Sequence, residues 1–206
     1  MSTCRSRVLT RIKHAGALPG VMGRILIAYS TVDGHTRRIC ERLRERVEPR
    51  GHQVTLLDLA DADGHDLEPY DRIVIGASIR YGKHRPAVVD FIKRNAGLLN
   101  RKPSAFFSVN VVARKPEKNK PETNPYVRKL LRRIAWRPDE AAVFAGKIDY
   151  PRYDWLDRLV IRFIMWLTRG PTDPTAVVEF TDWSQVDAFA GVIAGLSKRA
   201  SPPRNA

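Results

Sequence analysis

Cysteine is scarce in this sequence: Cys4 and Cys40 are the only two among 206 residues. Two cysteines make no disulfide framework, and neither belongs to a C-x-x-C pair or to a cysteine–histidine cluster with metal-ligand spacing. We therefore expect a protein of a reducing compartment that holds no metal ion.

Long apolar runs are missing as well. No stretch approaches the roughly 20 apolar residues that a helix needs to span a bilayer. Residues 1–21 are basic and contain no acidic side chain, and residues 201–206 read SPPRNA. We expect both ends to lie outside the folded domain as an extension and a disordered tail, with a targeting peptide as the alternative for residues 1–21.

Acidic residues are outnumbered by basic ones. The sequence has 22 Asp and Glu against 36 Lys and Arg, a formal net charge of +14. Such an excess favours an anionic partner, which can be nucleic acid, an acidic membrane surface or an acidic small molecule. Because no nucleic-acid recognition motif is present, we expect one of the last two.

What the sequence does contain is an alternation of short β-branched runs and helical patterns, which is typical of a parallel sheet with crossover helices. The predicted strands are residues 24–30, 53–59, 72–78, 104–110 and 142–148. The predicted helices are residues 35–47, 86–99, 125–136 and 184–197. This order predicts one α/β domain over residues 22–200, a flavodoxin-like doubly wound five-stranded parallel sheet. We expect the long-chain type, because an insert at about residues 150–174 interrupts strand five.

The first strand ends in a turn of small and hydroxylated residues, STVDGHT, directly before a helix. Helix N-termini present free N–H groups, hydroxyls donate further hydrogen bonds and glycine tolerates a tight backbone, so the turn suits a phosphate. It is neither a G-x-G-x-x-G nor a Walker loop, which disfavours dinucleotides and ATP. A helix N-cap without a ligand is the alternative for this turn taken alone. Its residues are Ser30, Thr31, Val32, Asp33, Gly34, His35 and Thr36.

Two more loops follow predicted strands. GASIRYGK ends the third strand, and its small residues, aromatic residue and second glycine let backbone amides approach a flat heterocycle; the fourth strand runs into SVNVVARKPEKNKP. Because doubly wound sheets bind ligands beyond the carboxyl ends of their strands, the three loops together predict a site for flavin mononucleotide (FMN). The expected residues of the second and third loops are Ala77, Ser78, Ile79, Arg80, Tyr81, Gly82, Ser108, Val109 and Asn110. No residue stands out as a catalytic acid or base.

A basic amphipathic segment lies between residues 114 and 137, which carry nine Lys and Arg against two Glu. On a helical wheel, one arc holds Arg128, Lys129, Arg132 and Arg133, with Trp136 among them. An aromatic residue within a basic face suits an interfacial membrane anchor, and the solvated face of a packed helix is the alternative.

The insert contains a second amphipathic helix, predicted over residues 154–169. Its 16 residues are about 24 Å long, short of a bilayer core of roughly 30 Å. We expect it to pack on the domain with one face and to meet lipid or substrate with the other, a purely structural insert being the alternative. The broad apolar arc consists of Trp155, Leu156, Leu159, Val160, Phe163, Trp166 and Leu167.

Beyond these patterns, the chain resembles the bacterial menaquinone-dependent protoporphyrinogen IX dehydrogenases, which are long-chain flavodoxin-like enzymes. The resemblance covers about residues 22–197 and rests on STVDGHTR, YDRIVIGASIRYGKH, PSAFFSVNVVARKPEKNKPETN, WRPD, YPRYDWLDRLVIRFIM and TDWSQV. It implies that the first turn is the FMN phosphate loop and that Asp33 belongs to it. A carboxylate there must point away from the phosphate, and we expect it to cap the following helix.

The resemblance also implies an activity: FMN-dependent oxidation of protoporphyrinogen IX to protoporphyrin IX in haem biosynthesis, six electrons in three two-electron steps, with menaquinone or ubiquinone as acceptor. It places the protein peripherally on the anionic cytoplasmic face of the bacterial inner membrane. The two propionates of this substrate make Arg80, Lys83, Arg85, Arg114 and Lys115 candidates for substrate binding. A flavodoxin-like electron carrier and an NAD(P)H:quinone oxidoreductase are the alternatives, and a homo-oligomer is left open.

Overall fold

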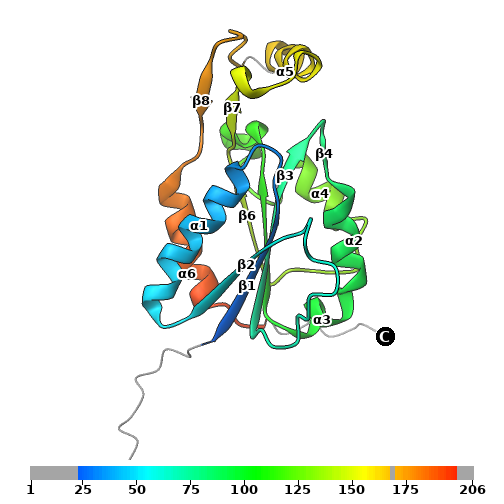
Figure 1. The fold of residues 1–206 in the computed structure, drawn as a ribbon, viewed down its shortest axis with the longest axis vertical. Helices are drawn as coiled ribbons and strands as arrows, with labels where there is room; N and C mark the ends of the chain where they lie inside the picture. The colour runs from blue at the N-terminus through cyan, green and yellow to red at the C-terminus, as the bar shows by residue number, and fades with distance from the viewer. Residues whose placement is uncertain (1–22, 168–169, 199–206) are drawn as a thin grey trace, which may run out of the picture.

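The computed structural model describes residues 23–167 and 170–198, which contain a twisted sheet covered by helices on both faces (Figure 1). Five parallel strands stand in the order β2-β1-β3-β5-β6. They are β1 (Arg24–Ser30), β2 (Gln53–Asp58), β3 (Arg72–Arg80), β5 (Ser104–Val109) and β6 (Glu140–Phe144). This is the strand order of flavodoxin-type doubly wound sheets, so the predicted fold class is confirmed.

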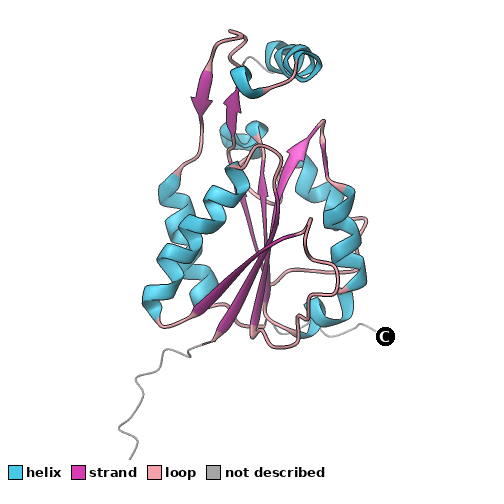
Figure 2. Cartoon of the chain, viewed as in Figure 1, coloured by secondary structure: helices cyan, strands magenta, loops and turns pink. Residues whose placement is uncertain are grey.

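Successive residues of the central strands point to opposite faces of the sheet and build two cores. Leu26 of β1 and Ile75 of β3 belong to the core under α2 (Pro86–Arg94), α3 (Ala96–Arg101) and α4 (Pro125–Leu131). Ile27 and Val74 belong to the core under α1 (His35–Val47) and α6 (Trp183–Ala194). Figure 2 shows the two helical layers with the sheet between them. Since both faces are covered, the strands are apolar almost throughout.

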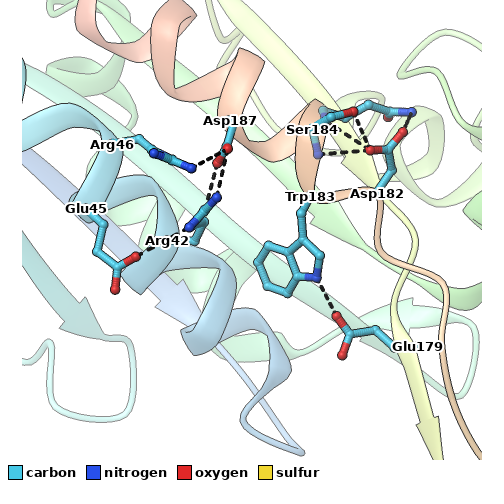
Figure 3. Close-up of polar contacts among 9 residues, drawn as sticks. Arg42, Glu45, Arg46, Glu179, Asp182, Trp183, Ser184 and Asp187 are labelled. Carbon is cyan, nitrogen blue, oxygen red and sulfur yellow. Dashed lines mark hydrogen bonds and ion pairs between the residues drawn. The ribbon is translucent and has the colours of Figure 1, made fainter.

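The helices α1 and α6 are joined by ion pairs at their surface (Figure 3). Arg42 grips the carboxylate of Asp187 with two hydrogen bonds of 2.7 and 2.9 Å, and Arg46 lies 2.9 Å from the same group. The two guanidinium groups lower the pKa of Asp187 to about 2. At its start, α6 is capped by Asp182, whose carboxylate accepts from the backbone N–H groups of Ser184 and Gln185.

Two predicted helices end earlier than expected. The helix predicted over residues 86–99 breaks at Asn95, whose side-chain amide donates to the Phe91 carbonyl, and α3 restarts at Ala96. The helix predicted over residues 125–136 ends at Leu131, because the following chain turns inward. Arg137 holds this turn by donating to the carbonyls of Leu131, Ile134 and Trp136.

The placement of Trp136 on the basic surface arc was wrong. Its side chain is fully buried, packs edge-on against Phe106 and donates an indole N–H to Ser104 Oγ at 3.0 Å. Trp136 is therefore a core residue and no membrane anchor. Arg128, Lys129, Arg132 and Arg133 are exposed, as expected for that arc.

The insert follows β6, and the strand predicted over residues 142–148 was wrong in its second half. The sheet strand β6 ends at Phe144, whereas β7 (Lys147–Asp149) pairs antiparallel with β8 (Val177–Glu179). This ribbon carries α5 (Trp155–Leu167), which lies beyond the carboxyl ends of the sheet strands (Figure 1). Short 3-10 turns complete the structure: η1 (Glu48–Arg50), η2 (Val111–Arg114), η3 (Pro116–Lys118) and η4 (Tyr150–Arg152).

A third, small core joins the insert to the domain. Ile148, Tyr150, Tyr153 and Met165 of the insert are buried there, and the partly buried Val111 of the domain packs against them. Among the described helices, none has the length and apolar character to cross a membrane. Residues 1–21 and 201–206, for which we predicted an extension and a tail, lie outside the described residues.

Candidate functional site

The turn after β1 places two hydroxyl groups that lack partners at the start of α1. The side-chain oxygens of Thr31 and Thr36 are buried, and neither has a hydrogen-bond partner among the described residues. Gly34 stands at the helix N-cap with φ 80°, a left-handed conformation that strains any residue with a Cβ. The first N–H groups of α1 open onto the same turn. Hydroxyl donors and free N–H groups at a helix N-terminus fit a phosphate.

The second predicted loop is the tip of a hairpin that the sequence did not reveal. A short strand, β4 (Lys83–His84), pairs antiparallel with the end of β3, and Arg80 lies opposite Lys83. The two residues between them, Tyr81 and Gly82, have φ 49° and 74°. Two consecutive positive φ values are what a type I′ hairpin turn requires. Tyr81 is therefore held in an uncommon backbone conformation, with 53% of its surface exposed.

The third predicted loop, at the end of β5, is fixed by a buried polar network. Ser108 Oγ lies 3.1 Å from Nε2 of His84, and the Asn110 side chain accepts from the N–H of Ala113 at 3.0 Å. Asn124 donates to Asn110 at 3.3 Å, tying the start of α4 to the loop. Burial lowers the pKa of His84 to about 4, so its imidazole is neutral at pH 7. This network makes the floor of the site rigid.

Asp33 forms an ion pair in place of the helix cap that we expected. Among the described residues no side chain caps α1 at Gly34, and the expectation for Asp33 was wrong. Its carboxylate lies 3.1 Å from Arg80, whose other nitrogen pairs with Asp157 of α5. The Arg80 guanidinium also lies 5.3 Å from the ring centre of Tyr153 in the insert. Arg80 thus connects the phosphate turn, the β3–β4 hairpin and the insert.

The other substrate candidates have different surroundings. Arg85 donates to the Thr31 carbonyl at 3.1 Å, and Arg114 donates to the Val111 carbonyl at 3.0 Å. Burial lowers the pKa of Arg114, whose guanidinium faces the ring of Phe180 at 5.9 Å. Lys83 is exposed and Lys115 is half-buried. Arg80, Arg85 and Arg114 thus make contacts within the protein. Substrate binding by any of the five cations stays a prediction.

Sequence reasoning missed several residues of this region: His84, Asn124, Tyr153 and Asp157. Each contacts a residue that is distant in the sequence: Asp157 forms an ion pair with Arg80, and His84 is hydrogen-bonded to Ser108. The Y-G dipeptide before Lys83 is the one local signal for the hairpin that was available, since glycine favours the second position of a type I′ turn. The described residues contain no group of three or more His, Cys, Asp or Glu that could hold a metal ion.

All three predicted loops lie at the carboxyl ends of neighbouring strands β1, β3 and β5 (Figure 1). The two unpartnered threonine hydroxyls suit the phosphate of FMN, and the hairpin and β5 loops provide backbone groups for a flat ring. Fold and site together define a flavodoxin-type FMN protein. The individual FMN contacts of Ser30–Thr36, Ala77–Gly82 and Ser108–Asn110 stay predictions.

Comparison with known proteins identifies the family within this class of flavodoxin-type proteins. The family model described as a flavodoxin domain matches residues 26–175. The protoporphyrinogen IX dehydrogenase (quinone) of Escherichia coli K12 is 48% identical over 174 residues, covering 84% of this chain and 96% of that protein. Its counterpart from Leishmania major is 42% identical over 180 residues, covering 87% of this chain and 78% of that protein. The chain belongs to the family of quinone-dependent protoporphyrinogen IX dehydrogenases, and its cofactor is FMN.

Proposed function

We propose that this protein oxidises protoporphyrinogen IX to protoporphyrin IX and delivers the electrons to a membrane quinone. The observation that carries the proposal is the 48% identity with an enzyme of that name over 96% of its length. FMN, when bound, would supply the two-electron redox chemistry that this oxidation requires.

The chain's own residues bind and orient the cofactor. The Thr31 and Thr36 hydroxyls, which are buried without partners among the described residues, would donate to the phosphate together with the first N–H groups of α1. The hairpin of β3 and β4 would support the flavin ring, and the network of Ser108, Asn110 and His84 holds the β5 loop beside it in place.

A membrane quinone requires the protein to reach the bilayer surface, and α5 is suited to that contact. Its apolar arc faces away from the third core: exposed fractions run from 41% for Val160 to 69% for Trp155. The opposite side of the helix is occupied, because Arg158 and Arg162 donate to the backbone carbonyls of Tyr153 and Thr172. An amphipathic helix with an exposed apolar face suits the membrane interface.

Charge supports the same orientation. Arg128 and Arg132 on and after α4 are exposed, and the chain carries a net charge of +14. Each Lys or Arg near an anionic lipid surface contributes on the order of 1 kcal/mol, screened beyond a Debye length of about 8 Å. We propose peripheral attachment at the anionic cytoplasmic face of the inner membrane, with apolar insertion by α5 as the part that salt does not screen.

The activity is tested with the purified FMN-loaded protein, anaerobic protoporphyrinogen IX and a quinone in vesicles. The expected result is porphyrin fluorescence that rises only when FMN and an electron acceptor are both present. No porphyrin formation above a flavin-free control would refute the proposed reaction.

Membrane attachment is tested by flotation with anionic vesicles. Phe163→Asp on the exposed face of α5 is expected to abolish the binding that survives high salt, and Val192→Asp, an exposed apolar residue of α6, is its matched control. The Phe163 variant should slow turnover with a vesicle quinone and retain turnover with a soluble acceptor. Equal flotation of the two variants would show that α5 does not face lipid.

A further inference from the structure

A groove of about 490 Å³ lies between α2, β4 and α4, beside the hairpin tip. Its volume falls within the range of roughly 300–1,000 Å³ that is usual for small-molecule sites. Figure 1 shows these three elements on the same side of the sheet, with β4 and α4 toward the end of the molecule where α5 lies.

The groove combines an apolar floor with a basic rim. Val89, Leu130 and the half-buried ring of Tyr126 line the floor. The rim carries four cations, which are Lys83, Lys93, Lys129 and Arg133, against one acid, Asp90. None of the four cations has an ion-pair partner within the part of the chain that the structure describes.

The groove adjoins the predicted flavin site at the hairpin. Gly82 and Lys83 line it and belong to the hairpin, and His84 in its wall lies 3.1 Å from Ser108 of the β5 loop. Tyr81, at the tip of the same hairpin, is exposed. A ligand in the groove therefore lies beside the loops that hold the cofactor.

We propose that this groove binds a carboxylate-bearing tetrapyrrole, with the macrocycle on the apolar floor and its carboxylates on the cations of the rim. The assignment rests on the proposed function, since it names where the substrate of that reaction is held. It moves substrate recognition away from Arg80 and Arg114, which have internal contacts. Of the rim cations, Lys83 is one of the predicted substrate candidates, and Lys129 and Arg133 belong to the basic arc predicted from the sequence.

The geometry of α4 supplies a matched pair of variants. Lys129 and Arg133 line the groove, whereas Arg128 and Arg132 lie outside it. Two double variants are compared. The groove pair combines Lys129→Gln and Arg133→Gln, and the control pair combines Arg128→Gln and Arg132→Gln, so that each variant loses two exposed cations from the same segment. The probe is protoporphyrin IX, which keeps the two propionates, with its dimethyl ester as the uncharged counterpart.

Binding to the FMN-loaded protein is measured by equilibrium dialysis without lipid, and the flavin content of each variant reports folding. The groove pair should bind the diacid about tenfold more weakly than the unaltered protein, as expected for the loss of two partly exposed charge contacts. The control pair should bind it with a dissociation constant within about twofold of that of the unaltered protein. The ester should bind weakly to all three. Lys93→Gln, on the other wall, should weaken diacid binding independently.

Equal diacid binding by the two pairs, or equal binding of diacid and ester, would overturn the assignment. The assignment would also be overturned if the groove pair no longer bound anionic vesicles but still bound the diacid, because the cations would then bind lipid phosphate. Failure of the proposed function looks different: the unaltered protein would bind the diacid in the groove yet form no porphyrin from porphyrinogen with quinone.

Discussion

Replacing Thr36 with valine should change stability and cofactor affinity in opposite directions. The residue is 1% exposed and its hydroxyl has no hydrogen-bond partner among the described residues. A buried, unsatisfied hydroxyl costs about 1–3 kcal/mol, so the nearly isosteric valine should stabilise the FMN-free protein by about 1 kcal/mol or more. Loss of a hydrogen bond to a charged phosphate, about 1.5–3 kcal/mol, should weaken FMN binding by about 10- to 100-fold.

The assay is urea unfolding of the FMN-free protein together with fluorimetric titration of FMN. Ser104→Ala is the matched control, because its buried hydroxyl is satisfied: it donates to the Leu99 carbonyl and accepts from the Trp136 indole. The control should lose stability and retain its FMN affinity. If Thr36→Val destabilises the FMN-free protein and binds FMN normally, the Thr36 hydroxyl is not a phosphate ligand, and the assignment of the turn after β1 to the phosphate is wrong.

Three further predictions concern the network, the sheet and the insert. The native pKa of His84 is about 4, below its ordinary value of 6.5, so the free energy of unfolding should be highest above pH 6.5 and fall by about 3 kcal/mol toward pH 4. His84→Gln should abolish this fall in urea unfolding, and the same pH dependence in the variant and the unaltered protein would contradict the prediction. Gly76→Ala would place a Cβ 2.2 Å from the Phe107 ring and should cost at least about 1–3 kcal/mol in thermal unfolding, whereas the unhindered helical Gly97→Ala should gain about 0.5–1. Asp157→Asn removes the ion pair to the hairpin and should speed amide hydrogen exchange in α5 while FMN stays bound; unchanged exchange would show that the third core alone holds the helix.

Much of the fold could be read from the sequence because its signals are local. Apolar runs and helical periodicity predicted the parallel strands and the covering helices, and their alternation predicted a flavodoxin-like doubly wound sheet. Local signals also placed the three loops at one end of the sheet. The prediction for Trp136 was wrong because a helical wheel continues past the residue at which the chain turns, and that turn depends on Arg137 and on the Ser104 hydroxyl.

The candidate site was less predictable wherever a charged side chain has a distant partner. Asp33 was expected to cap the helix because a carboxylate in a phosphate loop must point away from the phosphate, and nothing local in the sequence indicates that Arg80 reaches it. The same holds for Asp157, which lies 77 positions after Arg80 in the chain and still pairs with it. Periodicity did identify the apolar arc of α5, but only the third core shows that this arc faces outward.

The ribbon of β7 and β8 makes the insert a separable cassette. The chain leaves the domain at Gly146 and returns at Phe180, whose N–H donates to the Gly146 carbonyl at 3.1 Å, and Thr181 is fastened to the Ala145 carbonyl at 2.8 Å. Residues 147–179 can therefore be excised or transplanted by joining two points that already touch. None of the five parallel strands would lose a neighbour. Removal of residues 147–179 would leave the parallel sheet paired as it is and would take away the helix that we propose to meet lipid.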